Sequence, residues 1–161
     1  MTEPLSSHFD SAGQPRMVDV SIKNVTTRTA RASALVRMRS QTLETICQRE
    51  GAKGDVLSVA KLAGIMGAKR TADLIPLCHP LSLDTVEISF DTTGDNTLRV
   101  EATVQVDAKT GVEMEALTAV SIAALTVYDM CKSIDREMSI ERLQLEEKHG
   151  GKSGDYIRPA T

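Results

Sequence analysis

Two charged residues near the end of an apolar stretch, Asp129 and Lys132, have a spacing that suits proton-transfer chemistry. They are three residues apart, so on a helix they lie on the same face. A carboxylate and an ammonium in contact shift each other's pKa and can give and take protons. The same spacing also forms an ordinary intrahelical ion pair, worth about 0.2 to 0.5 kcal/mol. The two residues alone leave both interpretations open.

The opposite end of this stretch carries a second acidic pair, Glu113 and Glu115. Fourteen residues separate Glu115 from Asp129, which is close to four helical turns, so both lie on one face but about 21 Å apart. One small substrate cannot easily reach both on a single helix. If both act in one site, the spacing predicts a site between two subunits, with each helix contributing a different end.

Two loops present further candidate residues. Cys78 and His79 stand in a segment bounded by Pro76 and Pro80, and prolines restrict the backbone of their neighbours. Such a histidine is either a placed functional group or a hydrogen-bonded structural residue. Lys53 stands in a glycine-containing loop before a predicted helix, so its ammonium would project from a constrained turn.

The sequence ends in a glycine-rich segment that contains Gly151, Lys152 and Ser153. It is not a P-loop, because the required glycine five residues earlier is absent and too few residues follow to form a helix. The segment is either a tail that presents Lys148 and Lys152 to an anion or a frayed terminus. A zinc site is not expected, since the adjacent Cys78 and His79 match no usual ligand spacing.

Composition narrows the class of protein. The chain has 161 residues, a net charge of −3 and 2% aromatic residues, so neither a basic surface nor stacking platforms for nucleic acid are expected. Three scattered cysteines argue against a disulfide framework and for a reducing compartment. The start of the chain lacks a signal pattern, and no uninterrupted apolar run has membrane-spanning length. These features predict a cytoplasmic protein that contacts neither nucleic acid nor membrane.

The hydrophobic pattern predicts an α+β fold. Alternation indicates strands at 18–22, 85–90, 98–106 and 140–147, and helical spacing indicates helices from Thr29 to Ile46, from Val56 to Lys69 and over 110–132. This order is typical of a ferredoxin-like split βαβ arrangement, with one antiparallel sheet and the helices packed on one face. We expect a flexible arm at residues 1–16, a single catalytic domain at 17–148 and a flexible glycine-rich tail at 149–161.

Five sequence blocks in this order resemble the molybdenum cofactor biosynthesis protein C family, the cyclic pyranopterin monophosphate synthases. They are Lys53-Gly-Asp-Val, Asp73-Leu-Ile-Pro-Leu-Cys-His-Pro-Leu81, Thr110-Gly-Val-Glu-Met-Glu-Ala-Leu-Thr118, Tyr128-Asp-Met-Cys-Lys132 and Gly150-Gly-Lys-Ser-Gly-Asp155. The resemblance implies conversion of (8S)-3′,8-cyclo-7,8-dihydroguanosine 5′-triphosphate to cyclic pyranopterin monophosphate, with release of pyrophosphate. It also implies a homohexamer built as a trimer of dimers, with sites at subunit interfaces.

The resemblance also assigns roles to individual residues. It makes acid/base residues of Asp129, Lys132, Lys53 and Lys148, and it places the substrate against Leu77, Cys78, His79, Glu113, Met114 and Glu115. It implies no resident metal or cofactor, and it leaves open whether Mg²⁺ accompanies the triphosphate and whether the protein contacts the upstream radical enzyme. The departures from the family pattern are His149, in place of a small residue, and Tyr156, in place of Trp or Phe.

Two other functions fit parts of the sequence. A metal-dependent phosphohydrolase would need a carboxylate cluster, which Glu113, Glu115 and Asp129 could supply across an interface; activity that survives a strong chelator would argue against it. A nucleotide-binding module without catalysis would return its ligand unchanged, and small ferredoxin-like domains often only bind.

Overall fold

The computed structural model describes residues 6–48 and 55–160. Within these residues the chain forms, in order, β1 (Thr26–Arg37), α1 (Ser40–Cys47), α2 (Val56–Lys69), α3 (Thr71–Leu74), β2 (Thr85–Thr93), β3 (Thr97–Ala108), α4 (Glu113–Cys131), β4 (Ser139–His149) and β5 (Tyr156–Ile157).

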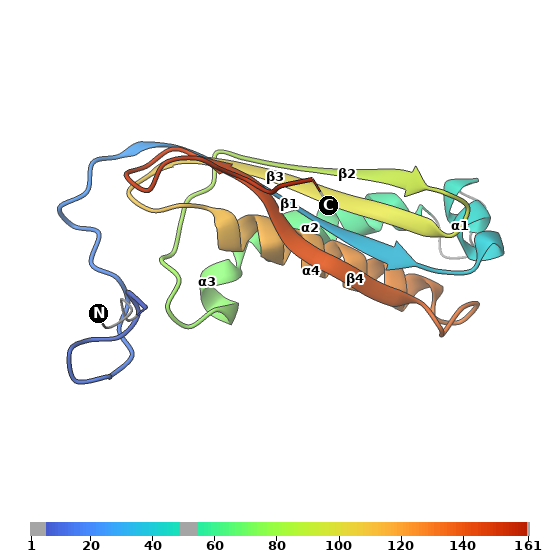
Figure 1. Ribbon diagram of the computed structural model, residues 1–161. Helices are drawn as coiled ribbons and strands as arrows, with labels where there is room; N and C mark the ends of the chain where they lie inside the picture. Colours follow the sequence, from blue (N-terminus) through green and yellow to red (C-terminus); the bar gives the residue numbers. More distant parts are fainter. Residues whose placement is uncertain (1–5, 49–54, 161) are drawn as a thin grey trace.

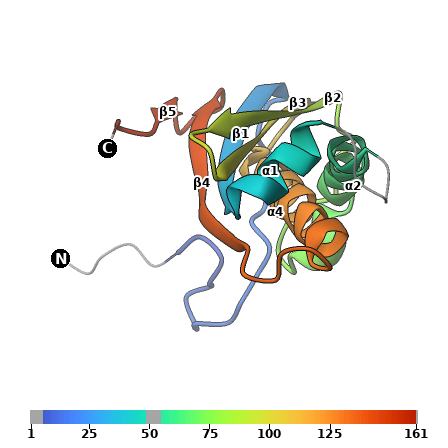
Figure 2. The ribbon, with the colours of Figure 1, turned by 90° about the vertical axis from the view of Figure 1, so that its right-hand side faces the viewer.

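The strands form one sheet in the order β2-β3-β1-β4-β5, and every neighbouring pair is antiparallel. Strand β3 lies between β1 and β2, and β1 lies between β3 and β4. These are the two interleaved split βαβ units of a ferredoxin-like fold. Figures 1 and 2 show α2 and α4 side by side on one face of this sheet. The predicted α+β fold, with its helices on one face, is confirmed.

The predicted helix from Thr29 to Ile46 is wrong over its first part. That part is the central strand β1, and only residues 40–47 are helical. Ala30, Ala32 and Ala34 are fully buried, and the residues between them point to the other face, so the true period is two. Alanine favours helices by intrinsic propensity, but pairing with β3 on one side and β4 on the other outweighs that preference.

The predicted strand at 18–22 is also wrong. Residues 18–22 form no strand, and the Lys23 amide donates to the Val20 carbonyl in a turn. Ile22 is 92% exposed, so its place in the alternating pattern corresponds to no buried face. A period of two predicts a strand only where a neighbouring strand supplies the hydrogen bonds.

Helix α4 runs the length of the sheet, from the end near α3 to the end near α1 (Figure 1). By length and composition alone it could cross a membrane, but half of its apolar window is buried within the fold, as in a core helix. It packs closely on α2 because Gly64 has no side chain: a Cβ there would lie 2.8 Å from the Ala119 carbonyl oxygen. Gly64 therefore permits the close approach of α2 to α4.

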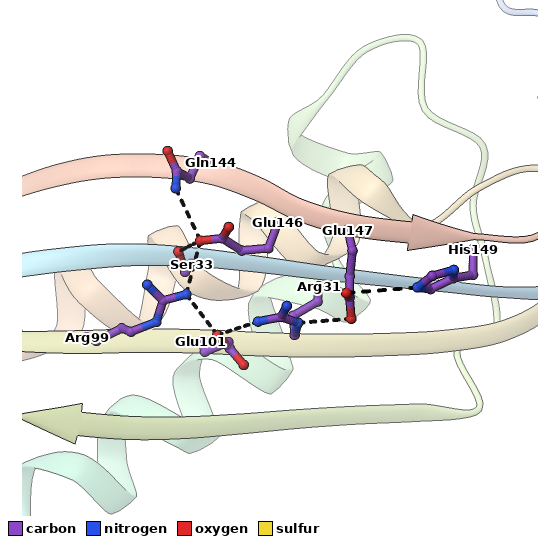
Figure 3. Close-up of polar contacts among 8 residues, drawn as sticks. All are labelled: Arg31, Ser33, Arg99, Glu101, Gln144, Glu146, Glu147 and His149. Atoms are coloured by element: carbon purple, nitrogen blue, oxygen red, sulfur yellow. Dashed lines mark hydrogen bonds and ion pairs between the residues drawn. The ribbon is translucent and has the colours of Figure 1, made fainter. Parts of the chain in front are cut away.

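The face of the sheet opposite the helices carries a network of charged side chains (Figure 3). Arg31 on β1 donates to Glu101 on β3 at 2.8 Å and to Glu147 on β4 at 3.0 Å. Arg99 donates to Glu101 and to Glu146, each at 3.0 Å. Glu146 and Glu147 share this face because the β1–β4 register shifts between Arg31 and Ala32. The network ties the three inner strands together on the side away from α4.

Candidate active site

All six residues predicted to contact substrate line one recess of about 330 Å³. Two segments supply them. The loop between α3 and β2 contributes Leu77, Cys78 and His79, and the first turn of α4 contributes Glu113, Met114 and Glu115. Ser7, His8, Val18 and Lys23 from the N-terminal segment also line it. The fold thus brings together two segments that are more than thirty residues apart in the chain.

Glu115 is the most unusual ionisable group of this recess. The residue is only 4% exposed and lies in the first turn of the core helix α4. Burial raises the pKa of its carboxyl to about 7, and the nearby charge of Glu113 acts in the same direction, while a backbone hydrogen bond partly offsets both. A carboxyl with this pKa exchanges a proton readily at neutral pH, as a general acid or base must.

Cys78 and His79 line the same recess from the loop between α3 and β2. The Cys78 amide donates to the Ile75 carbonyl at 3.1 Å, which fixes the turn after α3. Burial raises the pKa of the Cys78 thiol, and the charge of Glu115 raises it further. A thiol held neutral in this way is a poor nucleophile. The arrangement suits contact with a ligand better than covalent catalysis.

A second recess of about 200 Å³ adjoins the first. The two share Lys23, Thr110, Gly111 and Glu113, so one ligand can extend through both. Its other cationic lining residues are Arg28, Lys109 and Lys148, and His149 also lines it. Lys148, predicted to act in acid/base chemistry, contacts Glu113 at 3.1 Å and donates to Ser153 at 3.0 Å. It therefore joins the start of α4 to the C-terminal loop.

Asp129 and Lys132 are not part of either recess. They lie at the other end of α4, where the Lys132 ammonium donates to the Asp129 carboxylate at 2.6 Å and both side chains are more than half exposed. That hydrogen bond raises the pKa of Lys132. The intrahelical pair therefore exists, and within one chain it stands apart from the recess. Lys53 lies outside the described residues.

The sequence patterns missed three cations of the second recess: Lys23, Arg28 and Lys109. Arg28 immediately precedes the stretch that was predicted to be helical from Thr29, and the structure places it in β1. Read as a strand, position 28 is in phase with the buried Ala30 and Ala32. An arginine on the buried side of a strand is unusual unless it is paired, so the correct period would have identified it.

No group of three His, Cys, Asp or Glu side chains is placed to hold a metal ion among residues 6–48 and 55–160. Glu113 and Glu115 are close together at one end of α4, and Asp129 is at the other end. The carboxylate cluster of a phosphohydrolase would therefore require a second subunit.

The protein is a small α+β domain in which a recess with a buried, titratable carboxyl adjoins a recess lined by cations. This arrangement suits the binding of a phosphorylated small molecule. Residues 17–151 match the model of the MoaC family, and the chain belongs to that family.

Curated relatives cover nearly the whole chain. Cyclic pyranopterin monophosphate synthase 3 of Mycobacterium tuberculosis (strain ATCC 25618 / H37Rv) is 56% identical over 94% of this chain and 86% of the relative. Cyclic pyranopterin monophosphate synthase of Desulfitobacterium hafniense is 55% identical over 94% of this chain and 93% of the relative. Cyclic pyranopterin monophosphate synthase of Heliobacterium modesticaldum is 56% identical over 97% of this chain and 98% of the relative. The resemblance found in the sequence blocks is confirmed.

Proposed function

We propose that this protein is a cyclic pyranopterin monophosphate synthase, a lyase of molybdenum cofactor biosynthesis. It converts (8S)-3′,8-cyclo-7,8-dihydroguanosine 5′-triphosphate to cyclic pyranopterin monophosphate and releases pyrophosphate. The names of its relatives support the assignment. The observation that carries it is the gathering of Leu77–His79 and Glu113–Glu115 around one recess that continues into a cationic one.

The chemistry of the two recesses suits the two halves of this substrate. Opening and rebuilding a purine-derived ring requires several proton transfers, and Glu115 titrates near neutral pH. The triphosphate requires positive charge, which the neighbouring recess supplies through Lys and Arg side chains. The ring system therefore occupies the first recess and the phosphates extend toward the second.

The proposal includes a second subunit in each site. Asp129 is about 21 Å along α4 from Glu115, and Lys132 is farther still, so neither can reach the same substrate from one chain. Exposed apolar side chains lie on α2 at Val59, Leu62 and Met66, and Leu125 on α4 is 53% exposed. Such residues support a surface that another copy covers. We propose a homohexamer, a trimer of dimers, in which Asp129 and Lys132 complete the recess of a neighbour.

The first test is turnover of the purified cyclic intermediate, following pyrophosphate and product mass for wild type and Asp129→Ala. Wild type should form the pyranopterin, and the variant should bind substrate without converting it. If wild type returned the intermediate unchanged, the protein would instead be a nucleotide-binding module without catalysis. Activity that disappears with a chelator and returns with a metal ion would favour either the phosphohydrolase or a metal-assisted synthase. The mass of the product would distinguish these two.

Mixed oligomers test the shared site directly. Glu115→Gln and Asp129→Ala are each expected to be inactive alone. When the two are co-expressed, random assembly should restore about one quarter of the wild-type sites, because one chain supplies Glu115 and the other Asp129. The control mixture is Asp129→Ala with Lys132→Ala, which alters the same end of α4 and should not recover. Mixed oligomers with no restored activity would show that the site lies within one chain.

The proposal places this enzyme in the cytoplasm, which is supported by its three cysteines, Cys47, Cys78 and Cys131, since none forms a disulfide within residues 6–48 and 55–160. It assigns no resident cofactor. Its substrate is supplied by a radical enzyme, and transient contact with that enzyme would shorten the path of an unstable intermediate. Co-purification of the two proteins in the presence of the cyclic intermediate tests this contact.

A further inference from the structure

Asp135 is a buried carboxylate for which the proposed chemistry has no use. The residue is 1% exposed and lies in the segment between α4 and β4. Its Oδ2 accepts from the Arg39 amide at 2.8 Å and from the buried Thr42 hydroxyl at 3.1 Å, and its Oδ1 accepts from the Glu137 amide at 3.2 Å. Burying a charge is costly unless such partners satisfy it. The cost ties the carboxylate to this one arrangement.

Arg39 holds this segment through its side chain as well as through its amide. Its Nε lies 3.3 Å from Asp135 Oδ1, and its Nη2 donates to the Ile134 carbonyl. The hydrogen bond from the Arg39 amide is the main reason why the pKa of the Asp135 carboxyl lies below its ordinary value, and the guanidinium charge acts in the same direction. The carboxylate is therefore ionised at neutral pH and remains a full partner of these donors.

Asp135 joins two parts of the fold that are far apart in the chain. Its amide donates to the carbonyl of Cys131, the last residue of α4, at 3.0 Å, so its main chain is bound to the end of that helix. Its side chain is bound to Arg39, which lies between the end of β1 and the start of α1. The residue thus fastens the end of α4 to the β1–α1 junction.

The Asp129–Lys132 pair stands directly before this fastening. Both side chains are more than half exposed, so their position depends mainly on the backbone of the last turn of α4. The Lys132 amide donates to the Tyr128 carbonyl at 2.8 Å, and the Tyr128 hydroxyl donates to the Arg136 carbonyl at 3.3 Å. The segment that holds Asp135 is therefore also tied to the turn that carries the pair. A catalytic group displaced by about 1 Å can lose about 100-fold in rate.

We propose that Asp135 is a positioning residue: it fixes the last turn of α4 against the β1–α1 junction and so sets where Asp129 and Lys132 stand in the recess of a neighbouring subunit. The inference rests on the proposed function, because it requires the pair to transfer protons there. Asp135 itself stays buried in its own chain and acts only through the pair.

Steady-state turnover of Asp135→Asn is the first test. Asparagine has nearly the same shape, but it has no charge and only one acceptor oxygen, so it cannot satisfy the donors on both sides. We expect kcat to fall about tenfold or more, with KM within about twofold of wild type, because the pair acts after substrate has bound. Asp95→Asn removes the same charge from an exposed turn between β2 and β3 and should turn over as wild type does. A wild-type kcat in Asp135→Asn would overturn the inference.

Mixed oligomers distinguish positioning from a general effect on folding. In a mixture of Asp129→Ala and Glu115→Gln chains, each restored site takes its recess from the first chain and its Asp129 from the second. Adding Asp135→Asn to the Glu115→Gln chain should lower the restored activity about tenfold. Adding it to the Asp129→Ala chain should leave that activity unchanged, because this chain supplies only the recess. An equal loss in the two mixtures would overturn the inference.

Arg39→Gln is the second variant if Asp135→Asn fails to fold. The Arg39 side chain is 59% exposed, and the substitution removes its contacts with Asp135 and the Ile134 carbonyl while the amide bond stays. It should lower kcat by a smaller factor than Asp135→Asn, again with KM unchanged. An unchanged kcat in Arg39→Gln would then overturn the inference.

The same measurements separate this inference from the function on which it rests. A wild type that forms the pyranopterin, together with an undiminished kcat in Asp135→Asn, would overturn the inference and leave the synthase assignment intact. A wild type that never forms the pyranopterin would overturn the synthase assignment, and the role of Asp135 with it.

Discussion

At the scale of the residue, the candidate site contains one carboxyl, that of Glu115, which is buried away from water. Glu115 is buried at the start of α4, and this burial brings its pKa close to 7. An exposed glutamate titrates about three pH units lower and would be ionised throughout the neutral range. The fold therefore makes an ordinary residue type available for proton transfer.

The same shift has a measurable effect on stability. The ordinary pKa of the Glu115 carboxyl is 4.5 and its folded value is about 7. Between these values the folded chain holds a proton that the unfolded chain has lost. The contribution of the Glu115 carboxyl to the free energy of unfolding is fully present below about pH 4.5 and is lost as pH rises through 7. The total loss is about 3 kcal/mol.

Urea unfolding at pH 4.5 and pH 8, at one protein concentration, checks this effect. Relative to wild type, Glu115→Gln should gain about 3 kcal/mol of unfolding free energy between the two pH values, because glutamine has no charge to bury. The exposed Glu44→Gln provides the control. A constant difference between wild type and Glu115→Gln would mean that Glu115 titrates alike in both states.

At the scale of the element, the position of α4 decides which residues meet. Its first turn lies beside the loop after α3, and its packing on α2 depends on small residues at the contact. A Cβ at Gly64 would meet the Ala119 carbonyl oxygen at 2.8 Å and the Ala123 Cβ at 3.1 Å. Any side chain there must push the two helices apart.

Gly64→Val should therefore destabilise the protein by about 2 kcal/mol or more, since overpacked sites cost about 1 to 3 kcal/mol. Chemical denaturation at fixed pH measures the change. Lys61→Ala, exposed on the same helix, should stay within about 0.5 kcal/mol of wild type. An unchanged stability for Gly64→Val would mean that α2 and α4 are packed less closely than the structure describes.

At the scale of the whole molecule, the two ends of α4 carry different groups of predicted site residues. The recess lies at one end and the Asp129–Lys132 pair at the other, so a complete set of predicted residues requires a second copy. Val59, Leu62 and Met66 on α2 and Leu125 on α4 are exposed apolar residues of the helical layer. A charge placed within an apolar interface destabilises it.

Leu62→Lys should lower the molar mass measured by light scattering from that of the proposed hexamer, about six times 17.4 kDa, to that of a smaller species, with loss of activity. Gln41→Lys adds the same charge at an exposed position on α1 and should leave the assembly unchanged. If Leu62→Lys keeps both the mass and the activity of wild type, the helical layer is not the covered surface.

Much of the fold follows from local sequence pattern. The hairpin of β2 and β3 and the long helix α4 were predicted from alternation and from helical spacing, because each pattern reports the geometry of a single element. The resemblance identified Leu77–His79 and Glu113–Glu115, which the fold brings to one recess. The assignment of Asp129, Lys132, Lys53 and Lys148 to catalysis remains a prediction.

The sequence by itself determined the residue types, the periods of the isolated elements and the family. Only the tertiary structure decided that residues 26–37 form a central strand, that Arg28 lies buried beside the C-terminal loop, and that Glu115 titrates near neutral pH. The physical reason is the same in each case. Strand pairing, burial and pKa depend on neighbours far away in the chain, and no local period or spacing records which distant residues those neighbours are.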